Sequence, residues 1–321
     1  MKKGTAVWLI TAGALILVGA MIFVGVMTVL NWDFMKLSTA TLVTNEYVPE
    51  GEFVGISISG DTEDVLILPS ENGETRIVCT EYEKVPHTVT VKDGELSIEA
   101  RDNRKWYEHI GITFGTPSVT VYLPKGEYGA LSVAVSTGDV SVSEGYIFDA
   151  VVLSASTGNI DVRSSAKGAM ALSASTGSIT LTDASAEALA LSVSTGGVKV
   201  RNVTVTGDAS VKVTTGKSDL GALQCGAFSS VGSTGAITLT DVIAEGAISI
   251  ERETGDVRLD RCDAAEITVL TDTGDVEGTL LSEKVFIVAT DTGKKDVPES
   301  LTGGKCKITT DTGDIVIDIV K

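Results

Sequence analysis

The chain has 321 residues, of which 43% are hydrophobic and only 5% aromatic, and its formal net charge at pH 7 is −18. Abundant Ser, Thr, Ala, Val and Gly favour many short strands with small, regular interiors over one core of bulky side chains. So acidic a chain is a poor partner for nucleic acid or anionic lipid, whereas basic partners and divalent cations remain possible.

The first 32 residues differ from the rest of the chain. Two lysines, at positions 2 and 3, precede an uncharged run from Thr5 to Trp32. At 1.5 Å per residue, the roughly 26 apolar or small residues in this run span roughly 39 Å, enough to cross a bilayer. A cleaved signal peptide is the alternative, but its apolar region is usually about 7–15 residues long. The length of the run therefore predicts a single-pass membrane anchor over residues 1–32. The two lysines before it predict, by the positive-inside rule, that the N-terminus lies in the cytoplasm and the remainder outside.

Two further segments come before a long series of repeats. Residues 33–52 are predicted to be a linker, and residues 53–128 contain six strand-like runs with irregular spacing. A stack of repeats needs an atypical end unit that covers its last hydrophobic layer. We therefore predict that residues 53–128 form a β-rich N-terminal cap. Alternatively, Trp106, Tyr107 and His109 line a ligand pocket in this region.

A Thr-Gly pair then recurs ten times, and successive glycines are 19 or 20 residues apart. The glycines are Gly138, Gly158, Gly177, Gly196, Gly216, Gly235, Gly255, Gly274, Gly293 and Gly313. A fixed period of this size indicates stacked copies of one small unit. Residues 129–321 are therefore predicted to form a repeat domain.

Apolar side chains alternate on both sides of each pair. They lie two and four positions after the glycine, as Val140 and Val142 do, and three, five and seven positions before it. Such alternation indicates strands with one buried face. The buried positions switch from odd to even at the pair, so the chain must bend there, and glycine supplies the positive φ that a corner usually needs. By the same parity, the threonine before each glycine, such as Thr137, is expected to point inward.

The predicted fold class is therefore all-β. Coiling the units side by side gives a β-solenoid similar to a parallel β-helix, with about ten coils of 19–20 residues and strands about 4.8 Å apart. The crossover rule favours a right-handed coil. The chain is expected to end on an uncovered strand, Ile315 to Val320, whose open edge would suit docking or self-association through the C-terminal coil.

Carboxylates gather at the corners of the last four repeats. They are Glu253, Asp256, Asp272, Asp275, Asp291, Asp311 and Asp314, and Lys294 interrupts the series. Stacked carboxylates repel one another, and Ca²⁺ prefers several oxygen ligands, so this set is a candidate for weak Ca²⁺ binding. The alternative is that these are ordinary turn residues whose side chains bond to local backbone.

The repeat offers no catalytic constellation and no cofactor site. Asp-Thr-Gly, the triplet of aspartic proteases, occurs at Asp272, Asp291 and Asp311. Those enzymes bring two such loops together across a cleft, whereas here the triplets belong to one outward series. Paired acids can also cleave glycans, but no aromatic sugar platforms accompany them along the repeats.

The cysteines and histidines do not form a metal motif in the sequence. No two of the four cysteines have C-x-x-C spacing, and His87 and His109 do not complete a metal set with them. Disulfides are an alternative for a protein outside the cell, but buried free thiols are the expected state of Cys79, Cys225, Cys262 and Cys306.

The repeated Ser/Asp-Thr-Gly corner, followed by Asp or Asn and then Ile or Val, resembles bacterial β-strand-repeat proteins known as candidate adhesins, a domain family of unknown function. The run Val119 to Pro124, followed by Leu131 to Val133, is similar to it, and so is the segment from Gly60 to Val65. The resemblance covers roughly residues 53–321. It implies a single-pass or exported envelope protein that binds surfaces, and it supplies no catalytic residues.

The sequence thus predicts a non-enzymatic, membrane-anchored, extracytoplasmic β-solenoid that acts as an adhesin-like or envelope-associated binding module. An envelope protein or a glycan is the expected partner. A self-assembling β-helical scaffold is the alternative, and a glycan-cleaving enzyme is the third hypothesis.

Overall fold

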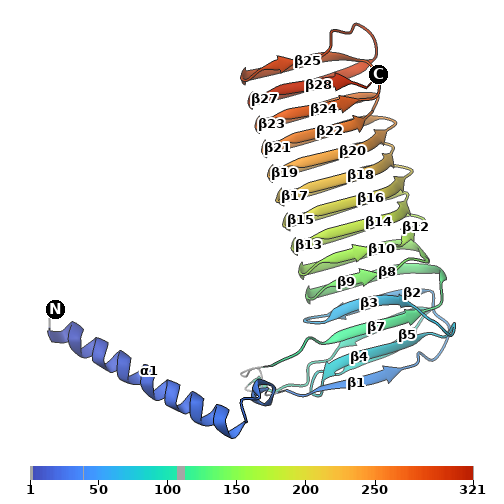
Figure 1. Cartoon of the computed structure of the whole chain (residues 1–321). Coiled ribbons are helices and arrows are strands. Elements are labelled where there is room, and N and C mark those ends of the chain that lie inside the picture. Colours follow the sequence, from blue (N-terminus) through green and yellow to red (C-terminus); the bar gives the residue numbers. More distant parts are fainter. Residues whose placement is uncertain (1–2, 39, 107–112, 321) are drawn as a thin grey trace.

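A computed structural model describes residues 3–38, 40–106 and 113–320 of the chain. An apolar helix, α1 (Lys3–Val29), comes first and is followed by a short 3-10 helix, η1 (Phe34–Leu37). Within α1, the segment Val7–Val29 is long and apolar enough to cross a membrane. Its large side chains, such as Trp8 and Ile16, are exposed, and the helix projects from one end of a stack of strands (Figure 1).

The described residues after the helices form 28 strands. They are β1 (Leu42–Tyr47), β2 (Gly55–Gly60), β3 (Asp64–Pro69), β4 (Arg76–Tyr82), β5 (His87–Lys92), β6 (Glu95–Ala100), β7 (Ser118–Leu123), β8 (Gly126–Thr137), β9 (Val140–Val142), β10 (Tyr146–Thr157), β11 (Ile160–Val162), β12 (Ser165–Ala166), β13 (Ala169–Thr176), β14 (Ile179–Ala186), β15 (Ala188–Thr195), β16 (Val198–Val205), β17 (Ala209–Thr215), β18 (Ser218–Cys225), β19 (Phe228–Thr234), β20 (Ile237–Ala244), β21 (Ala247–Thr254), β22 (Val257–Cys262), β23 (Glu266–Thr273), β24 (Val276–Leu280), β25 (Lys284–Thr292), β26 (Lys295–Asp296), β27 (Gly304–Thr312) and β28 (Ile315–Ile319).

These strands form two sheets of fourteen strands that run the length of a rod (Figure 1). Each turn of the chain gives one strand to each sheet, and strands of neighbouring turns pair in parallel and in register, as β15 does with β17 and β16 with β18. The prediction of an all-β solenoid with about ten regular coils is confirmed.

The core is a narrow layer between the two sheets. In the turn of β15 and β16, Leu189, Leu191 and Val193 before the glycine and Val198 and Val200 after it are all at most 2% exposed. Burying one such side chain contributes about 1.5–3 kcal/mol, so each turn adds a similar increment when it stacks on its neighbour.

The corner glycines are required for two reasons. All ten have φ between +129° and +156°, a region that residues with a side chain avoid. In addition, a Cβ on Gly216 would overlap the carbonyl oxygen of Gly196, the glycine of the preceding turn. The predicted bend at the Thr-Gly pair is therefore confirmed, and the close stacking of the corners explains why the pair recurs without change.

The expected inward orientation of the corner threonines is wrong. All ten, Thr137 among them, are exposed. The bend begins two residues before the glycine. The residues one and two positions before the glycine therefore both point away from the core, on the outer side of the bend. Burial resumes three positions before the glycine and two positions after it. The threonines therefore form an exposed column along the edge of the rod.

A second bend, which the alternation did not reveal, lies six residues after the glycine in five turns. It is marked by a positive φ at Asp183, Asn202, Ala222, Asp241 and Arg261. The buried positions switch parity there once more, so that Val200 and Val203 both face the core. Asp and Asn tolerate this left-handed backbone better than most residues, which explains their frequency at this position.

Both ends of the rod depart from chain order. At the α1 end, the turn of β2 and β3 lies between that of β6 and β7 and that of β8 and β9. At the far end, the last turn, β27 and β28, lies between β23 and β24 on one side and β25 and β26 on the other. The expectation of an uncovered C-terminal strand is therefore wrong, because β28 is paired on both sides and β25 and β26 form the open edges.

The segment before the cap is also more ordered than expected. Residues 33–52 contain β1, which pairs antiparallel with β4, so this segment is not simply a linker. In turn, β4 pairs antiparallel with β7, and β5 with β6. These antiparallel strands end the parallel stack at the α1 end.

Candidate functional site

The carboxylates of the predicted Ca²⁺ set lie exposed along the corner edge. Because the last turn is inserted, their order along the rod differs from their order in the sequence. The residues two before the glycine follow one another as Glu253, Asp272, Asp311 and Asp291. The residues after the glycine follow as Asp256, Asp275, Asp314 and then Lys294, so Lys294 ends this column and does not interrupt it.

The column after the glycine is held by backbone hydrogen bonds. Asp256 Oδ1 accepts the amide N–H of Asp275 at 3.1 Å, and Asp275 Oδ1 accepts that of Asp314 at 2.8 Å. Asp139 and Asn159 form the same contact near the other end. These bonds oppose the repulsion between neighbouring carboxylates without an ion. Within the described ranges, none of these carboxylates belongs to a group of three ligand atoms within 4.8 Å of one another, and Ca²⁺ binding stays a prediction.

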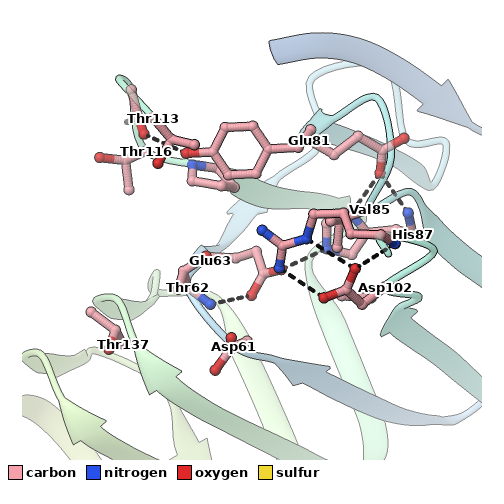
Figure 2. Close-up of a pocket in the computed structure, with 15 residues that line it drawn as sticks. Asp61, Thr62, Glu63, Glu81, Val85, His87, Asp102, Thr113, Thr116 and Thr137 are labelled. Carbon is pink, nitrogen blue, oxygen red and sulfur yellow. Dashed lines mark hydrogen bonds and ion pairs between the residues drawn. The ribbon is translucent and has the colours of Figure 1, made fainter. Parts of the chain in front are cut away.

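A cavity of about 390 Å³ lies at the α1 end of the same corner edge (Figure 2). Its walls come from the corner between β2 and β3, the turn that joins β4 in one sheet to β5 in the other, the segment that joins β6 to β7, and Thr137 at the end of β8. Asp61, Glu63, Glu81, His87, Asp102 and Arg104 supply titratable groups to this lining. Among them, Glu63, Glu81 and His87 are at most 5% exposed, so the cavity brings buried titratable groups to the end of the regular columns.

Glu63 occupies a position that is glycine in all ten Thr-Gly corners. Val65 pairs with Val140, and Asp64 Oδ1 accepts the amide N–H of Asp139 at 2.9 Å, so Asp61-Thr62-Glu63 aligns with Ser-Thr-Gly of the next turn. The layer beneath Glu63 is not another tight corner, since the amide of Asp64 bonds instead to the carbonyl of Pro117 at 3.0 Å. A side chain therefore fits here.

Gly60 makes space for that side chain. A Cβ on Gly60 would overlap Glu63 Oε2, so the missing side chain leaves room for the carboxylate. The amide of Thr62 donates a hydrogen bond to the same oxygen at 2.8 Å. Glu63 is 3% exposed, and the local sequence thus places a carboxylate inside the edge of the cavity.

Glu81 on β4 and His87 on β5, two strands that a turn joins from one sheet to the other, complete the cluster. Glu81 Oε2 accepts the backbone N–H of His87 and lies 2.6 Å from His87 Nδ1, while Oε1 accepts hydrogen bonds from Asn45 at 2.6 Å and Tyr47 at 3.2 Å. Because a carboxylate only accepts, Nδ1 carries the proton in this contact. Glu81 thereby joins β1 to the imidazole of His87.

The other imidazole nitrogen faces the first corner. His87 Nε2 lies 3.6 Å from Glu63 Oε1, and it is buried without a hydrogen bond from any described residue. Burial alone would lower the pKa of His87, but the carboxylates of Glu63 and Glu81 outweigh it and raise that pKa above its usual value. Burial would likewise raise the pKa of Glu63, and the imidazole reverses this effect and lowers it. His87 therefore lies between two buried acidic side chains, Glu63 and Glu81.

Cys79 is adjacent to this cluster. Cys79, Glu81 and His87 each offer a ligand atom, and these atoms lie within 4.8 Å of one another. Burial, followed by the charges of Glu81 and Glu63, raises the pKa of the Cys79 thiol to about 12, so the thiol stays protonated. Since four donors already occupy Glu81, these three residues are poorly prepared to hold an ion in this arrangement. The accessible lone-pair position is His87 Nε2.

Sequence spacing did not reveal this cluster. The spacing did not connect His87 with the cysteines, whereas the turn between β4 and β5 brings His87 and Cys79 together. The signal that was available is Asp61-Thr62-x-Asp64-Val65, which matches the repeated corner except at the glycine. Of the aromatic pocket considered above, Trp106 is 79% exposed, while Tyr107 and His109 lie outside the described residues. The four cysteines are free and buried, as predicted.

The two long sheets, the glycine corners and the antiparallel cap define a β-solenoid of stacked short strands. The chain matches the family model described as Toastrack DUF4097 over residues 54–223, more than half of its length, and it belongs to that family. This confirms the family resemblance found in the sequence. No functionally curated protein matches the chain.

Solved structures of similar proteins have low sequence identity to this one. A candidate adhesin from Bacteroides fragilis is 15% identical, with 88% of this chain and 99% of that chain covered and a TM-score of 0.35. One from Parabacteroides distasonis is 11% identical, with 88% and 98% covered and a TM-score of 0.46. A candidate lipid binding protein from the same species is 13% identical, with the same coverage and a TM-score of 0.40.

Proposed function

We propose that this protein is a non-enzymatic binding module of the cell envelope, held to the membrane by α1 with the rod outside the cytoplasm. The observation that carries the proposal is α1 itself, an apolar helix most of whose large side chains are exposed, with Met27 near its end as a buried exception. Two lysines precede the span, which favours a cytoplasmic N-terminus.

The join between helix and rod supports a role close to the membrane surface. Only residues 30–41 separate α1 from β1, and β1 is fixed to β4 along its whole length. The rod therefore begins twelve residues after the helix, without a long tether. Its net negative charge disfavours lying flat on anionic lipid, so the rod stands away from the membrane and presents its sides.

The sides of the rod suit broad contact better than catalysis. The outward positions of β8, β10 and β13 are mostly small, and Ser132, Ala134 and Ser173 among them are exposed. The corner edge adds the exposed threonine column. In the cavity, Glu63 and Glu81 are both engaged by His87, which leaves neither as an isolated acid. The partner proposed for these surfaces is an envelope protein or a glycan.

Topology is tested by labelling a new thiol. Because all four native cysteines are buried, Thr195→Cys on the corner edge provides a single exposed thiol. A membrane-impermeant maleimide should label this variant in intact cells, while the unmodified chain should remain unlabelled. Labelling that requires cell lysis would overturn the proposed orientation.

Binding is tested by photo-crosslinking from the two exposed surfaces. Crosslinkers placed at Thr195 on the edge and at Ser173 on the face, in the full-length chain, should trap a discrete envelope component in intact cells. Competition by soluble cell-wall glycan would identify a glycan partner. If neither position gives a specific adduct, the binding role is wrong.

Self-assembly into a scaffold receives less support from the structure. The open edge strand β26 is two residues long, consists of Lys295 and Asp296, and is followed by Pro298. Short length, charge and proline are the features that block addition of another strand. The neighbouring β25 does keep Phe286 and Val288 half-buried. Concentration-dependent filaments of the detergent-solubilised chain, seen by electron microscopy, would favour the scaffold.

A further inference from the structure

We propose that His87 and Glu63 bind a divalent transition-metal ion, of the class that Zn²⁺ represents, at the edge of the cap cavity. This inference stands apart from the proposed binding role of the rod. It begins from a buried nitrogen: His87 is 5% exposed, and its Nε2 forms no hydrogen bond within the described part of the chain.

The imidazole is already oriented as a metal-binding histidine is. Metal-ligating histidines usually donate their second ring N–H to a carboxylate, which fixes the ring and its tautomer. Glu81 fills that role, since its Oε2 lies 2.6 Å from Nδ1 and its other contacts come from Asn45 and Tyr47. The remaining ligand atom, Nε2, is directed at Glu63 across the cavity edge.

The separation of the two ligand atoms suits an ion between them. Nε2 and Glu63 Oε1 are 3.6 Å apart, which is longer than a hydrogen bond of this kind. Zinc-to-nitrogen and zinc-to-oxygen bonds are about 2.0–2.1 Å, so two ligands separated by a near-tetrahedral or wider angle lie roughly 3.4–3.6 Å apart. The carboxylate and imidazole therefore need little movement to bind one ion.

Charge also favours the ion. The buried side chains of Glu63 and Glu81 flank the imidazole of His87, and both acids are at most 3% exposed. A divalent ion bound to His87 Nε2 and Glu63 would lie next to both acids, and their negative charge favours a cation at this place.

The two ligand atoms favour one class of metal ion, and they leave other coordination positions of that ion free. A nitrogen ligand disfavours Ca²⁺ and Mg²⁺, which prefer oxygen ligands alone, and favours the zinc class. Only two protein ligands are supplied, and the adjoining cavity of about 390 Å³ has room for water at the other positions. We therefore expect exchangeable metal binding at a site with open coordination positions.

Cobalt spectroscopy tests the proposal on the full-length chain in detergent micelles. Co²⁺ is titrated in the presence of excess Ca²⁺, which occupies the exposed carboxylates of the corner edge. We expect one equivalent of Co²⁺ to give visible ligand-field absorption, reversed by Zn²⁺, without a near-ultraviolet thiolate-to-metal band. A thiolate band would instead identify Cys79 as a ligand and overturn the assignment to Glu63.

Three variants make the result decisive. Glu63→Gly installs the residue that all ten Thr-Gly corners carry, and Glu63→Gln keeps the side-chain size; both should weaken Co²⁺ binding at least tenfold. Cys79→Ser should leave binding unchanged. Circular dichroism establishes that each variant is folded. Binding that survives in folded Glu63 variants, or that the unmodified chain lacks, would contradict the proposal.

Discussion

The ten Thr-Gly corners and the corner at Glu63 share one hydrogen-bond register but differ in what lies beneath them. Asp64 bonds to the amide of Asp139 as Asp139 bonds to that of Asn159. Beneath Gly158 lies the backbone of the preceding corner, whereas beneath Glu63 lies the segment that ends at Pro117. The comparison shows that glycine is demanded by the stacked neighbour. Where that neighbour is absent, the same position carries a buried carboxylate beside a cavity.

The largest expected effect comes from placing a side chain at a stacked corner. Gly196 has φ +140° and its Cβ would overlap the carbonyl of Gly177, whereas a Cβ on the adjacent Gly197 meets its nearest atom, Lys217 O, at 3.3 Å. Gly196→Ala should lower the free energy of unfolding by roughly 3 kcal/mol or more, and Gly197→Ala by about 1 kcal/mol or less. Chemical denaturation followed by circular dichroism measures both. Equal losses would refute the stacking explanation.

Breaking the charged cluster of the cap should come next. Glu81 is 1% exposed and accepts from β1 and from His87, so Glu81→Gln should cost about 3 kcal/mol by leaving the imidazole poorly compensated. The control is Glu277→Gln, which removes an exposed pair with Arg258 and should cost about 1 kcal/mol or less. Thermal melts compare the two, and a Glu81 variant as stable as the control would show that the cluster does not hold the cap together.

Gly232, like Gly60, lies three residues before a corner position, and it leads to a prediction of increased stability. Gly232 leaves room for the guanidinium of Arg252, which is 3% exposed and bonds to Ser230 at 2.8 Å, with no carboxylate partner among the described residues. Burial lowers the pKa of Arg252, the sign of a charge held at a cost. Arg252→Met should therefore raise stability by about 1 kcal/mol.

The matched control for this change is Arg258→Met at an exposed position, which should alter stability by about 0.5 kcal/mol or less. Both variants are compared by denaturant midpoint. A marked loss of stability in Arg252→Met would mean that the guanidinium has a favourable partner in the folded protein, and the contrast with the compensated Glu63 would fail.

The smallest effect separates the two acidic columns of the corner edge. Asp275 Oδ1 accepts the amide of Asp314, so Asp275→Ala should cost about 1 kcal/mol. Asp272 is exposed, and Asp272→Ala should change stability by about 0.5 kcal/mol or less. Melts with Ca²⁺ and with a chelator complete the test. If Ca²⁺ binds as the sequence predicts, both variants should also reduce the Ca²⁺-dependent rise in melting temperature; identical midpoints with and without Ca²⁺ would end that prediction.

The architecture was predictable because every repeat carries the same sequence pattern. The period, the alternation and the glycine each reappear ten times, so chance agreement is excluded. The threonine orientation failed because parity cannot be carried through a bend whose starting residue is unknown. Glu63 escaped notice because the cap is inserted after β3, which puts its corner far outside the 19–20-residue period. The exchange of the last two turns was invisible, since both turns carry the same Asp-Thr-Gly signature at Asp291 and Asp311.

That exchange has a consequence for the order in which the protein is made and folded. A growing chain can add its turns one by one as far as β23 and β24, but β25 and β26 cannot take their final place until β27 and β28 have been synthesised. The turn of β25 and β26 must either stay undocked until β27 and β28 are made, or dock on β23 and β24 first and then be displaced by them. A chain cut short before Gly304 thus lacks the strands with which β25 and β26 pair, so the placement of this turn depends on residues that are synthesised after it.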